Sequence, residues 1–269
     1  MKRNIDNEKV FAILTDTTRC TGCETCVGAC KQTYNLGRDR AWRWKRHVDD
    51  LSSTRFCTIL RRPQSHFVRQ QCRHCLDPAC VSACIVGALT RAADGAVVYN
   101  PAICIGCRYC MIACPFQIPA YEYSRALLPQ IRKCGFCAEP KAGRGADPAC
   151  AAACPSEALL FGKRAALLRA ARERIAAAPK RYVQNIYGER EAGGTAWLYL
   201  AGRPFTELGL LDVAPVSPAV RTEGIQHGVY RYGIIPLALY GLLGGLMWRQ
   251  RRLRRKGCPA APSEDGDEK

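Results

Sequence analysis

The chain has 269 residues, 18 cysteines and a formal net charge of +17, from 40 basic and 23 acidic residues. Its hydrophobic share of 48% excludes plain disorder, and its mean hydropathy of −0.16 excludes a protein with many membrane spans. Aromatic residues make up only 8%, so a core built from side chains alone would be thin. We therefore expect a group bound to sulfur to complete the core, while the positive charge leaves nucleic-acid binding open.

Few regular elements are predicted along the chain. Residues 10–14 and 96–99 are typical of short strands placed just before cysteine-rich loops. Residues 164–178 are rich in Ala and Arg and predict a helix that ends before Pro179. Residues 232–248 form a long apolar run without a formal charge. The cysteines between these elements carry most of the information.

Sixteen of the cysteines fall into four groups of four. The groups are Cys20, Cys23, Cys26 and Cys30; Cys72, Cys75, Cys80 and Cys84; Cys104, Cys107, Cys110 and Cys114; and Cys134, Cys137, Cys150 and Cys154. In the first and third groups, three cysteines are two residues apart and the fourth follows three residues later. This is the bacterial ferredoxin spacing for [4Fe–4S] clusters, in which the fourth cysteine ligates a neighbouring cluster.

Three chemistries compete for these cysteines. Disulfides suit short secreted scaffolds, and four regular groups are atypical of them. Structural zinc usually takes two separated cysteine pairs per ion, which a run of three does not provide. Four thiolates per cluster give four closed [4Fe–4S] clusters, with no iron left open for a substrate. The spacing therefore predicts electron transfer without a catalytic residue, and a zinc protein that binds nucleic acid is the alternative.

An internal repeat indicates how the clusters are built. Residues 20–30 echo residues 104–114, and the run from Asp77 to Cys84 echoes the run from Asp147 to Cys154. The sequence thus predicts an α+β fold of duplicated bacterial-ferredoxin-like modules with insertions, which forms a four-cluster domain over residues 1–180. Residues 181–229 are predicted to be an extended linker that docks a partner.

The apolar run predicts one C-terminal transmembrane helix over residues 230–248. Tyr230, Tyr232 and Trp248 lie at its ends like interfacial anchors. Six Arg and Lys residues follow between 249 and 256, so the positive-inside rule predicts a cytoplasmic tail over residues 249–269. The expected location is the inner membrane with the iron–sulfur domain on the periplasmic side. A soluble polyferredoxin with a buried C-terminal helix is the alternative.

The order of the four groups resembles a known family, the four-cluster electron-transfer subunits of membrane-bound periplasmic oxidoreductases. Residues 67–75 and 106–116 are family-like around cysteines, and residues 186–189, 193–195 and 222–227 are more specific. With the apolar run, the C-terminal third resembles most the iron–sulfur subunit of quinone-linked nickel–iron hydrogenases of the hydrogenase-2 type. The chain is also similar to the formate dehydrogenase beta subunit.

The resemblance implies which cysteines share a cluster. The implied sets are Cys20, Cys23, Cys26 and Cys154; Cys30, Cys134, Cys137 and Cys150; Cys72, Cys75, Cys80 and Cys114; and Cys84, Cys104, Cys107 and Cys110. It further implies a catalytic partner, either a nickel–iron hydrogenase or a molybdopterin enzyme, and an integral membrane partner that is quinone-reactive or a cytochrome b. The chain would pass electrons between the two, and nucleic acid is not among the expected partners.

Two features depart from the family pattern, and two arginines add to it. Ile85 follows Cys84 where a proline is common, so that turn loses a fixed φ. The first residues show no export signal, which favours export together with the catalytic partner. Arg73 and Arg108 lie inside cluster loops, where positive charge is expected to raise the cluster potential.

Overall fold

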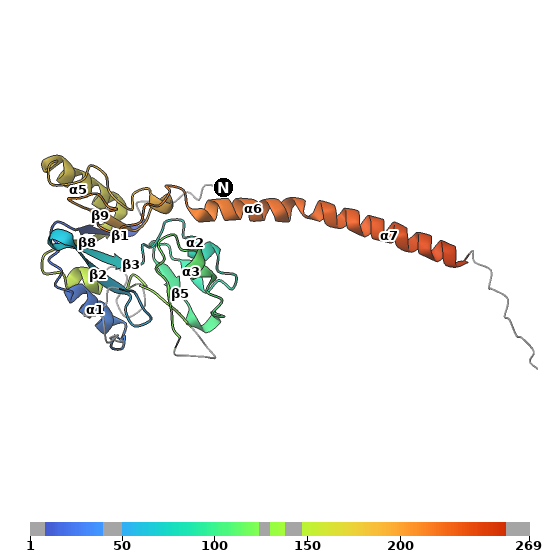
Figure 1. Ribbon diagram of the computed structural model, residues 1–269, viewed down its shortest axis with the longest axis horizontal. Coiled ribbons are helices and arrows are strands. Elements are labelled where there is room, and N and C mark those ends of the chain that lie inside the picture. Colours follow the sequence, from blue (N-terminus) through green and yellow to red (C-terminus); the bar gives the residue numbers. More distant parts are fainter. Residues whose placement is uncertain (1–8, 40–49, 124–129, 138–146, 257–269) are drawn as a thin grey trace, which may run out of the picture. The chain divides into compact units, whose positions relative to one another are not determined.

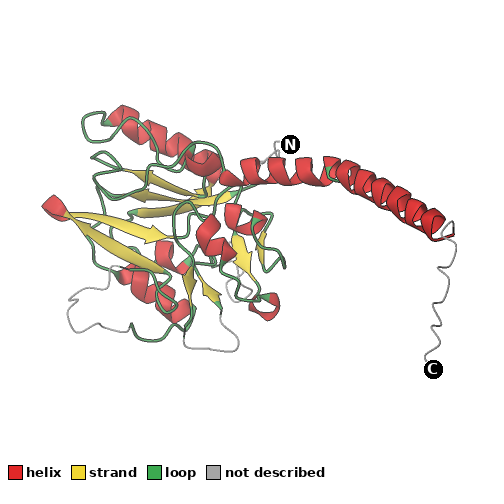
Figure 2. Ribbon diagram, turned by 45° about the vertical axis from the view of Figure 1, so that its right-hand side comes forward, coloured by secondary structure: helices red, strands yellow, loops and turns green. Residues whose placement is uncertain are grey.

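The computed structural model describes residues 9–39, 50–123, 130–137 and 147–256 (Figure 1). The chain divides into two compact units, Met1–Val220 and Arg221–Lys269. The first unit is a mixture of short helices and small sheets, and Figure 2 shows how much of it is loop (green). The predicted boundary at residue 180 does not coincide with this division, because residues 181–220 belong to the first unit.

A three-stranded sheet lies at the centre of the first unit. Its strands are β1 (Phe11–Asp16), β8 (Leu159–Lys163) and β9 (Trp197–Leu200), in the order β8-β1-β9. β1 pairs antiparallel with β8 and parallel with β9. All four residues of β9 are fully buried, so this strand, inside the segment predicted as a linker, is part of the core. The strand predicted at residues 10–14 is confirmed as β1, shifted by one to two residues.

Helix α5 (Arg164–Ala177) covers the central sheet and confirms the helix predicted at residues 164–178. Its first residue, Arg164, is buried and takes part in a backbone network. Arg164 donates from Nε to the Thr195 carbonyl at 2.8 Å and from Nη2 to the carbonyls of Gly188 and Glu189 at 3.3 and 3.0 Å. Hydrogen bonds from a charged donor are the stronger kind, so Arg164 fixes the loop that leads into β9.

The remaining strands form three antiparallel hairpins. They are β2 (Cys57–Arg62) with β3 (His66–Gln71), β4 (Leu89–Arg91) with β5 (Val97–Tyr99), and β6 (Ala120–Tyr121) with β7 (Ile131–Arg132). β5 confirms the strand predicted at residues 96–99. Three short 3₁₀ turns lie at Pro63–Ser65, Pro101–Ile103 and Glu191–Gly193.

Four short helices start next to cysteines and pack in two pairs. α1 (Thr25–Thr33) contacts α4 (Ala149–Ala152), and α2 (Ala79–Ser82) contacts α3 (Tyr109–Ala113). The first cysteine group is therefore next to the fourth, and the second is next to the third. This crossed arrangement is what positions the cysteines.

The second unit contains most of α6 (Pro218–Tyr232) and all of α7 (Ile234–Lys256). The prediction of a transmembrane helix at residues 230–248 is wrong: within the described ranges, no helix is long and apolar enough to cross a membrane. Gly233 separates the two helices, and the charge-free part of α7 ends at Trp248 after about 15 residues, or roughly 22 Å. A hydrocarbon core of about 30 Å needs about 20 apolar residues.

Residues 249–256 of the predicted cytoplasmic tail belong to α7. Residues 257–269 of the predicted tail lie outside the described residues.

Candidate iron–sulfur sites

Each cysteine group begins with a loop in which two cysteines are separated by two residues. In all four loops the residue before the second cysteine has a left-handed backbone, namely Gly22 (φ 73°), His74 (φ 47°), Gly106 (φ 69°) and Phe136 (φ 64°). This conformation turns the backbone N–H toward the sulfur of the first cysteine. The N–H of Gly106 donates to Cys104 Sγ at 3.4 Å, and that of Phe136 donates to Cys134 Sγ at 3.4 Å. Such bonds stabilise a thiolate.

The last cysteine of three groups is followed by the same turn. The N–H of Gly87, Gln117 and Glu157 donates to the carbonyl three residues earlier, at Cys84, Cys114 and Cys154, over 3.1 to 3.2 Å. Ile85 therefore leaves the turn intact where the other two have proline, and the N–H of Ala88 also donates to Cys84 Sγ at 3.2 Å. The departure from the family pattern changes the sequence without changing this local geometry.

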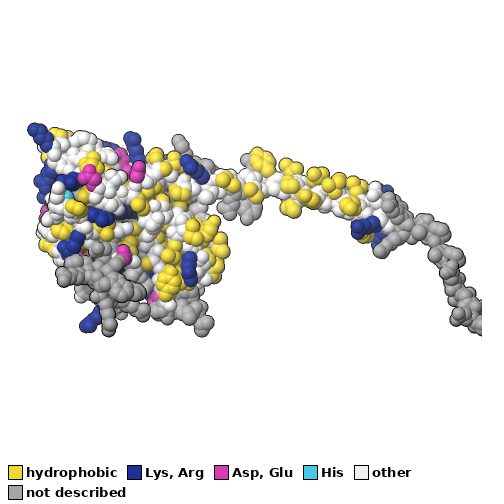
Figure 3. Space-filling model, in the orientation of Figure 1, with side chains coloured by type: hydrophobic (Ala, Val, Ile, Leu, Met, Phe, Trp, Pro, Cys, Tyr) yellow, Lys and Arg dark blue, Asp and Glu magenta, His cyan; other side chains and the backbone are white. Residues whose placement is uncertain are grey.

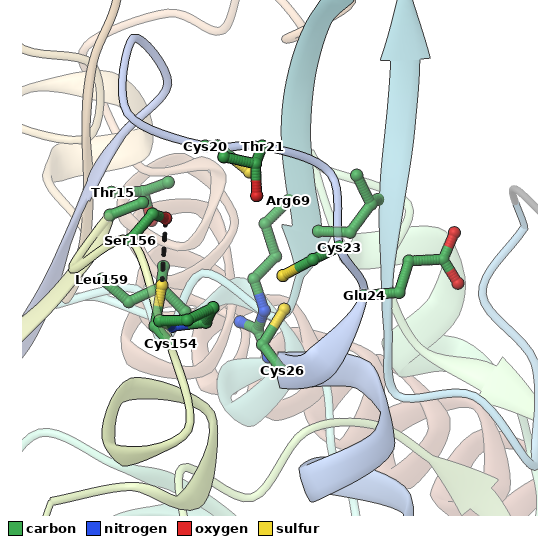
Figure 4. A pocket seen from close by; sticks show the side chains of 13 residues that line it. Thr15, Cys20, Thr21, Cys23, Glu24, Cys26, Arg69, Cys154, Ser156 and Leu159 are labelled. Atoms are coloured by element: carbon green, nitrogen blue, oxygen red, sulfur yellow. Dashed lines mark hydrogen bonds between the residues drawn. The ribbon is translucent and has the colours of Figure 1, made fainter.

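Site 1, defined by Cys20, Cys23, Cys26 and Cys154, surrounds a cavity of about 370 Å³, part of which is open to solvent (Figure 4). Three sulfurs come from the loop before α1 and from its first turn, and the fourth comes from the turn after α4. Hydrogen bonds from Thr25 lower the pKa of the exposed Cys23 thiol. Cys154 Sγ lies 3.7 Å from Ser156 Oγ.

Site 2, defined by Cys30, Cys134, Cys137 and Cys150, surrounds a cavity of about 270 Å³. Ile13, Phe136 and Trp197 supply apolar walls, so the site is set into the core beside the central sheet. Burial is the main cause that raises the pKa of the Cys134 thiol, and the neighbouring Cys72 and Cys150 add to it. Site 2 is thus an interior site close to other thiols.

The other eight cysteines form two further groups, recognised by their mutual electrostatic effects. Burial raises the pKa of Cys75, and the charges of Cys72, Cys80 and Cys114 raise it further. Burial likewise raises the pKa of Cys110 to about 11, with further contributions from Cys104, Cys107 and Cys84. We call these groups site 3 (Cys72, Cys75, Cys80, Cys114) and site 4 (Cys84, Cys104, Cys107, Cys110).

The four sites are neighbours in a row. Electrostatic repulsion between thiolates connects each site with the next. It acts between Cys26 of site 1 and Cys150 of site 2, between Cys134 of site 2 and Cys72 of site 3, and between Cys80 of site 3 and Cys110 of site 4. Sites 1 and 4 each contain an exposed cysteine, Cys23 and Cys107 respectively. The row therefore has interior sites 2 and 3 and two ends that reach the surface.

The donor set fits [4Fe–4S] clusters. Four neighbouring thiolates repel one another and need a cationic partner in order to ionise together, and cluster iron is bound by four cysteine thiolates. The reduction potential of a cluster depends on hydrogen bonds from backbone N–H groups to its sulfurs and on the apolar side chains around it. In the described part of the chain, no three His, Cys, Asp or Glu side chains form a site for a single metal ion. That these sixteen cysteines bind iron stays a prediction.

Three arginines near the cysteine groups differ in burial and in the side chains they contact. Arg73 is buried, its Nη1 donates to the Tyr199 hydroxyl, and its guanidinium lies 4.6 Å from the centre of that ring. Arg108 is exposed and lies 4.1 Å from the centre of the Tyr121 ring. Arg69, which sequence reasoning missed, is 1% exposed and lines both site 1 and site 2. No signal in the sequence separates it from Arg61 and Arg62 on the same hairpin.

Cys57 lies outside the four cysteine groups of the sequence. It is 1% exposed and forms a hydrogen bond with Cys30 of site 2, while its thiol also faces the carbonyl of Cys26 at 4.0 Å. It belongs to none of the four sites. Cys57 is a buried neighbour of the cysteines in sites 1 and 2.

Comparison with known proteins agrees with this geometry. Residues 63–164 match the family model of a 4Fe–4S dicluster domain. A protein of Nitratidesulfovibrio vulgaris is 44% identical over 247 residues, which cover 86% of this chain and 65% of the relative. The chain therefore spans just under two thirds of that relative's length.

Two other relatives carry descriptive names. The hydrogenase-2 operon protein HybA of Escherichia coli O157:H7 is 32% identical over 283 residues, which cover 90% of this chain and 84% of HybA. The B subunit of the anaerobic dimethyl sulfoxide reductase of Haemophilus influenzae is 36% identical over 155 residues, or 54% of this chain and 70% of that protein. The chain belongs to the family of iron–sulfur electron-transfer subunits that includes HybA and this reductase subunit.

Proposed function

We propose that the chain conducts electrons along four [4Fe–4S] clusters held at sites 1 to 4, in that order. The row of four cysteine groups carries this proposal, because each group lies next to its neighbours and the two ends reach the surface. When bound, each cluster supplies a one-electron couple. The protein's own residues hold the sulfurs, exclude water from sites 2 and 3, and set the charge around each site.

Metal and sulfide analysis tests the proposal. Protein purified anaerobically is expected to contain about sixteen irons and about sixteen acid-labile sulfides per chain, from four cubanes. Four or fewer irons would overturn the proposal. Zinc in place of iron would instead favour the zinc protein that binds nucleic acid.

The partners are proposed from the relatives. One relative is encoded in a hydrogenase-2 operon and another is a subunit of dimethyl sulfoxide reductase. We infer that electrons enter from a periplasmic catalytic subunit, a nickel–iron hydrogenase or a molybdopterin enzyme, and leave to a quinone-reactive membrane subunit. Copurification from detergent-solubilised membranes, followed by identification of the large partner, tests this assignment.

The two ends of the row differ in chemistry, which supports different partners. Around site 4 a set of large apolar side chains is exposed, comprising Ile85, Ile103, Ile105, Tyr109 and Ile112, with Ile112 79% exposed. Figure 3 shows hydrophobic side chains gathered where α2 and α3 lie. At site 1 the rim includes Glu24, which pairs with Arg61 at 3.2 Å. Since permanent interfaces are the more apolar ones, we assign the site 4 end to the membrane subunit.

Replacing Ile112 with glutamate is expected to weaken binding of the membrane subunit by roughly 30-fold, because a charge would be buried at the centre of an apolar contact. Quantitative copurification measures the effect, with iron content unchanged. Val216→Glu is the control, because Val216 is an apolar residue that is also exposed, at 47%, and it lies outside the set around site 4. Equal recovery with Ile112→Glu and wild type would contradict the assignment.

A further inference from the structure

Arg69 is a buried cation whose hydrogen-bonding groups are incompletely paired. It lies on β3, its side chain is 1% exposed, and its guanidinium lies 4.7 Å from the centre of the Trp197 ring. Within the described residues, Nε and Nη1 have no hydrogen-bond partner. Buried polar groups that stay unpaired destabilise the folded state, and the effect is larger when the group is charged. Something outside the protein's own oxygen and nitrogen atoms must compensate.

The charges that face Arg69 are sulfurs. Burial is the largest effect and disfavours the charged form of Arg69. The charges of four cysteines oppose it and raise the pKa of Arg69, in decreasing order Cys150, Cys57, Cys26 and Cys30. Of these, Cys26 belongs to site 1, while Cys30 and Cys150 belong to site 2. Figure 4 shows the guanidinium at site 1, between Cys26 and Cys154. Arg69 also lines the cavity of site 2, so it borders two sites rather than one.

The neighbouring basic groups have their own partners. Arg73 donates to the Tyr199 hydroxyl and is near Cys72, Cys75 and Cys114 of site 3 alone. Lys133 donates to the carbonyls of Val97 and Cys134 at 2.5 and 3.0 Å. Neither of them lines both cavities as Arg69 does.

We propose that Arg69 is the shared counter-ion of sites 1 and 2 and that it raises the reduction potentials of both. The proposal rests on the proposed function, since it requires a cluster at each site. A closed cubane changes from a charge of about −2 to about −3 when it accepts one electron. A fixed positive charge beside both sites favours that added electron, which comes from the donor upstream. The same charge offsets the repulsion between two neighbouring reduced sites.

The test is an anaerobic redox titration with dithionite, followed by electron paramagnetic resonance, on the full chain. The neutral variants Arg69→Met and Arg69→Gln are expected to lower the ratio of reduced to oxidised protein at a fixed potential by at least tenfold, about 59 mV for a one-electron couple. Two of the four redox steps should shift. Arg69→Lys, which keeps the charge, should shift them much less.

Two controls define the site of the effect. Arg73→Met should shift one step only, since Arg73 is near site 3 alone. Arg172→Gln should shift none, because the Arg172 side chain is 57% exposed and pairs with Glu189 at the surface. Unshifted steps in neutral Arg69 variants that contain the wild-type amount of iron would overturn the proposal.

Iron content separates the possible failures. Wild-type protein with four or fewer irons would contradict the proposed function itself, whatever Arg69 does. If neither neutral variant retains iron in sites 1 and 2 but Arg69→Lys does, the shared-cation role is supported. Loss of iron in Arg69→Lys as well would show that the shape of the guanidinium matters rather than its charge, and would overturn the proposal.

Discussion

Replacing Cys134 with alanine is expected to remove iron from site 2 and to stop electron flow between the two ends of the row. Cys134 is 6% exposed and is the first cysteine of its loop, where the N–H of Phe136 faces its sulfur. The three thiols that remain cannot bind a fourth iron. Iron per chain should fall by about one if a three-iron cluster survives, or by about four if the cluster is lost.

The sequence offers a matched control for this experiment. Cys57→Ala removes a thiol that is at least as buried, at 1% exposure, and that lies next to Cys30. Because Cys57 belongs to none of the four sites, iron should remain at the wild-type value. Electrons supplied at one end of the row should no longer reduce an acceptor dye at the other end in Cys134→Ala. In Cys57→Ala they should still do so. Full iron in Cys134→Ala, or lost iron in Cys57→Ala, would contradict the assignment of the two cysteines.

The cysteine groups were predictable because each one is local. Two or three sulfurs in a short loop surround one centre whatever the rest of the chain does, and the spacing shows this directly. The spacing alone could not predict that Cys20 and Cys154 come together, because their proximity depends on α1 packing against α4. Only the resemblance to a family implied that these two cysteines share a site.

Arg69 and β9 escaped prediction for a different reason. An arginine in a hairpin normally belongs to the surface, and only the tertiary fold shows that Arg69 enters the space between two sites. β9 has just four residues, and its burial depends on pairing with β1 far away in the sequence. The prediction of a C-terminal membrane span was wrong for another reason. The apolar composition suggested a span, but the charge-free run is too short to support one.

Removing the clusters is expected to unfold the first unit, because ligand bonds to a bound metal centre contribute to the free energy of folding. Site 1 draws its cysteines from the start of α1 and from the turn after α4, two helices that pack together although they are far apart in the sequence. Loss of the cluster would release this crosslink, and the same holds at the other sites. Typical domains have only about 5–15 kcal/mol of stability, so we expect the loss of four clusters to exceed that margin.

Hydrogen exchange detected by mass spectrometry measures this unfolding in the strands beside site 2. Residues 11–16 and 197–200 form β1 and β9, whose backbone lies in the buried sheet beside site 2. Ferricyanide with EDTA, applied anaerobically, destroys the clusters, and EDTA alone is the control that leaves closed clusters in place. After iron loss these peptides should exchange as fast as unfolded chain, since protection requires an intact core. Persistent protection in iron-free protein would show that the packed sheet, rather than the clusters, supplies the stability of this unit.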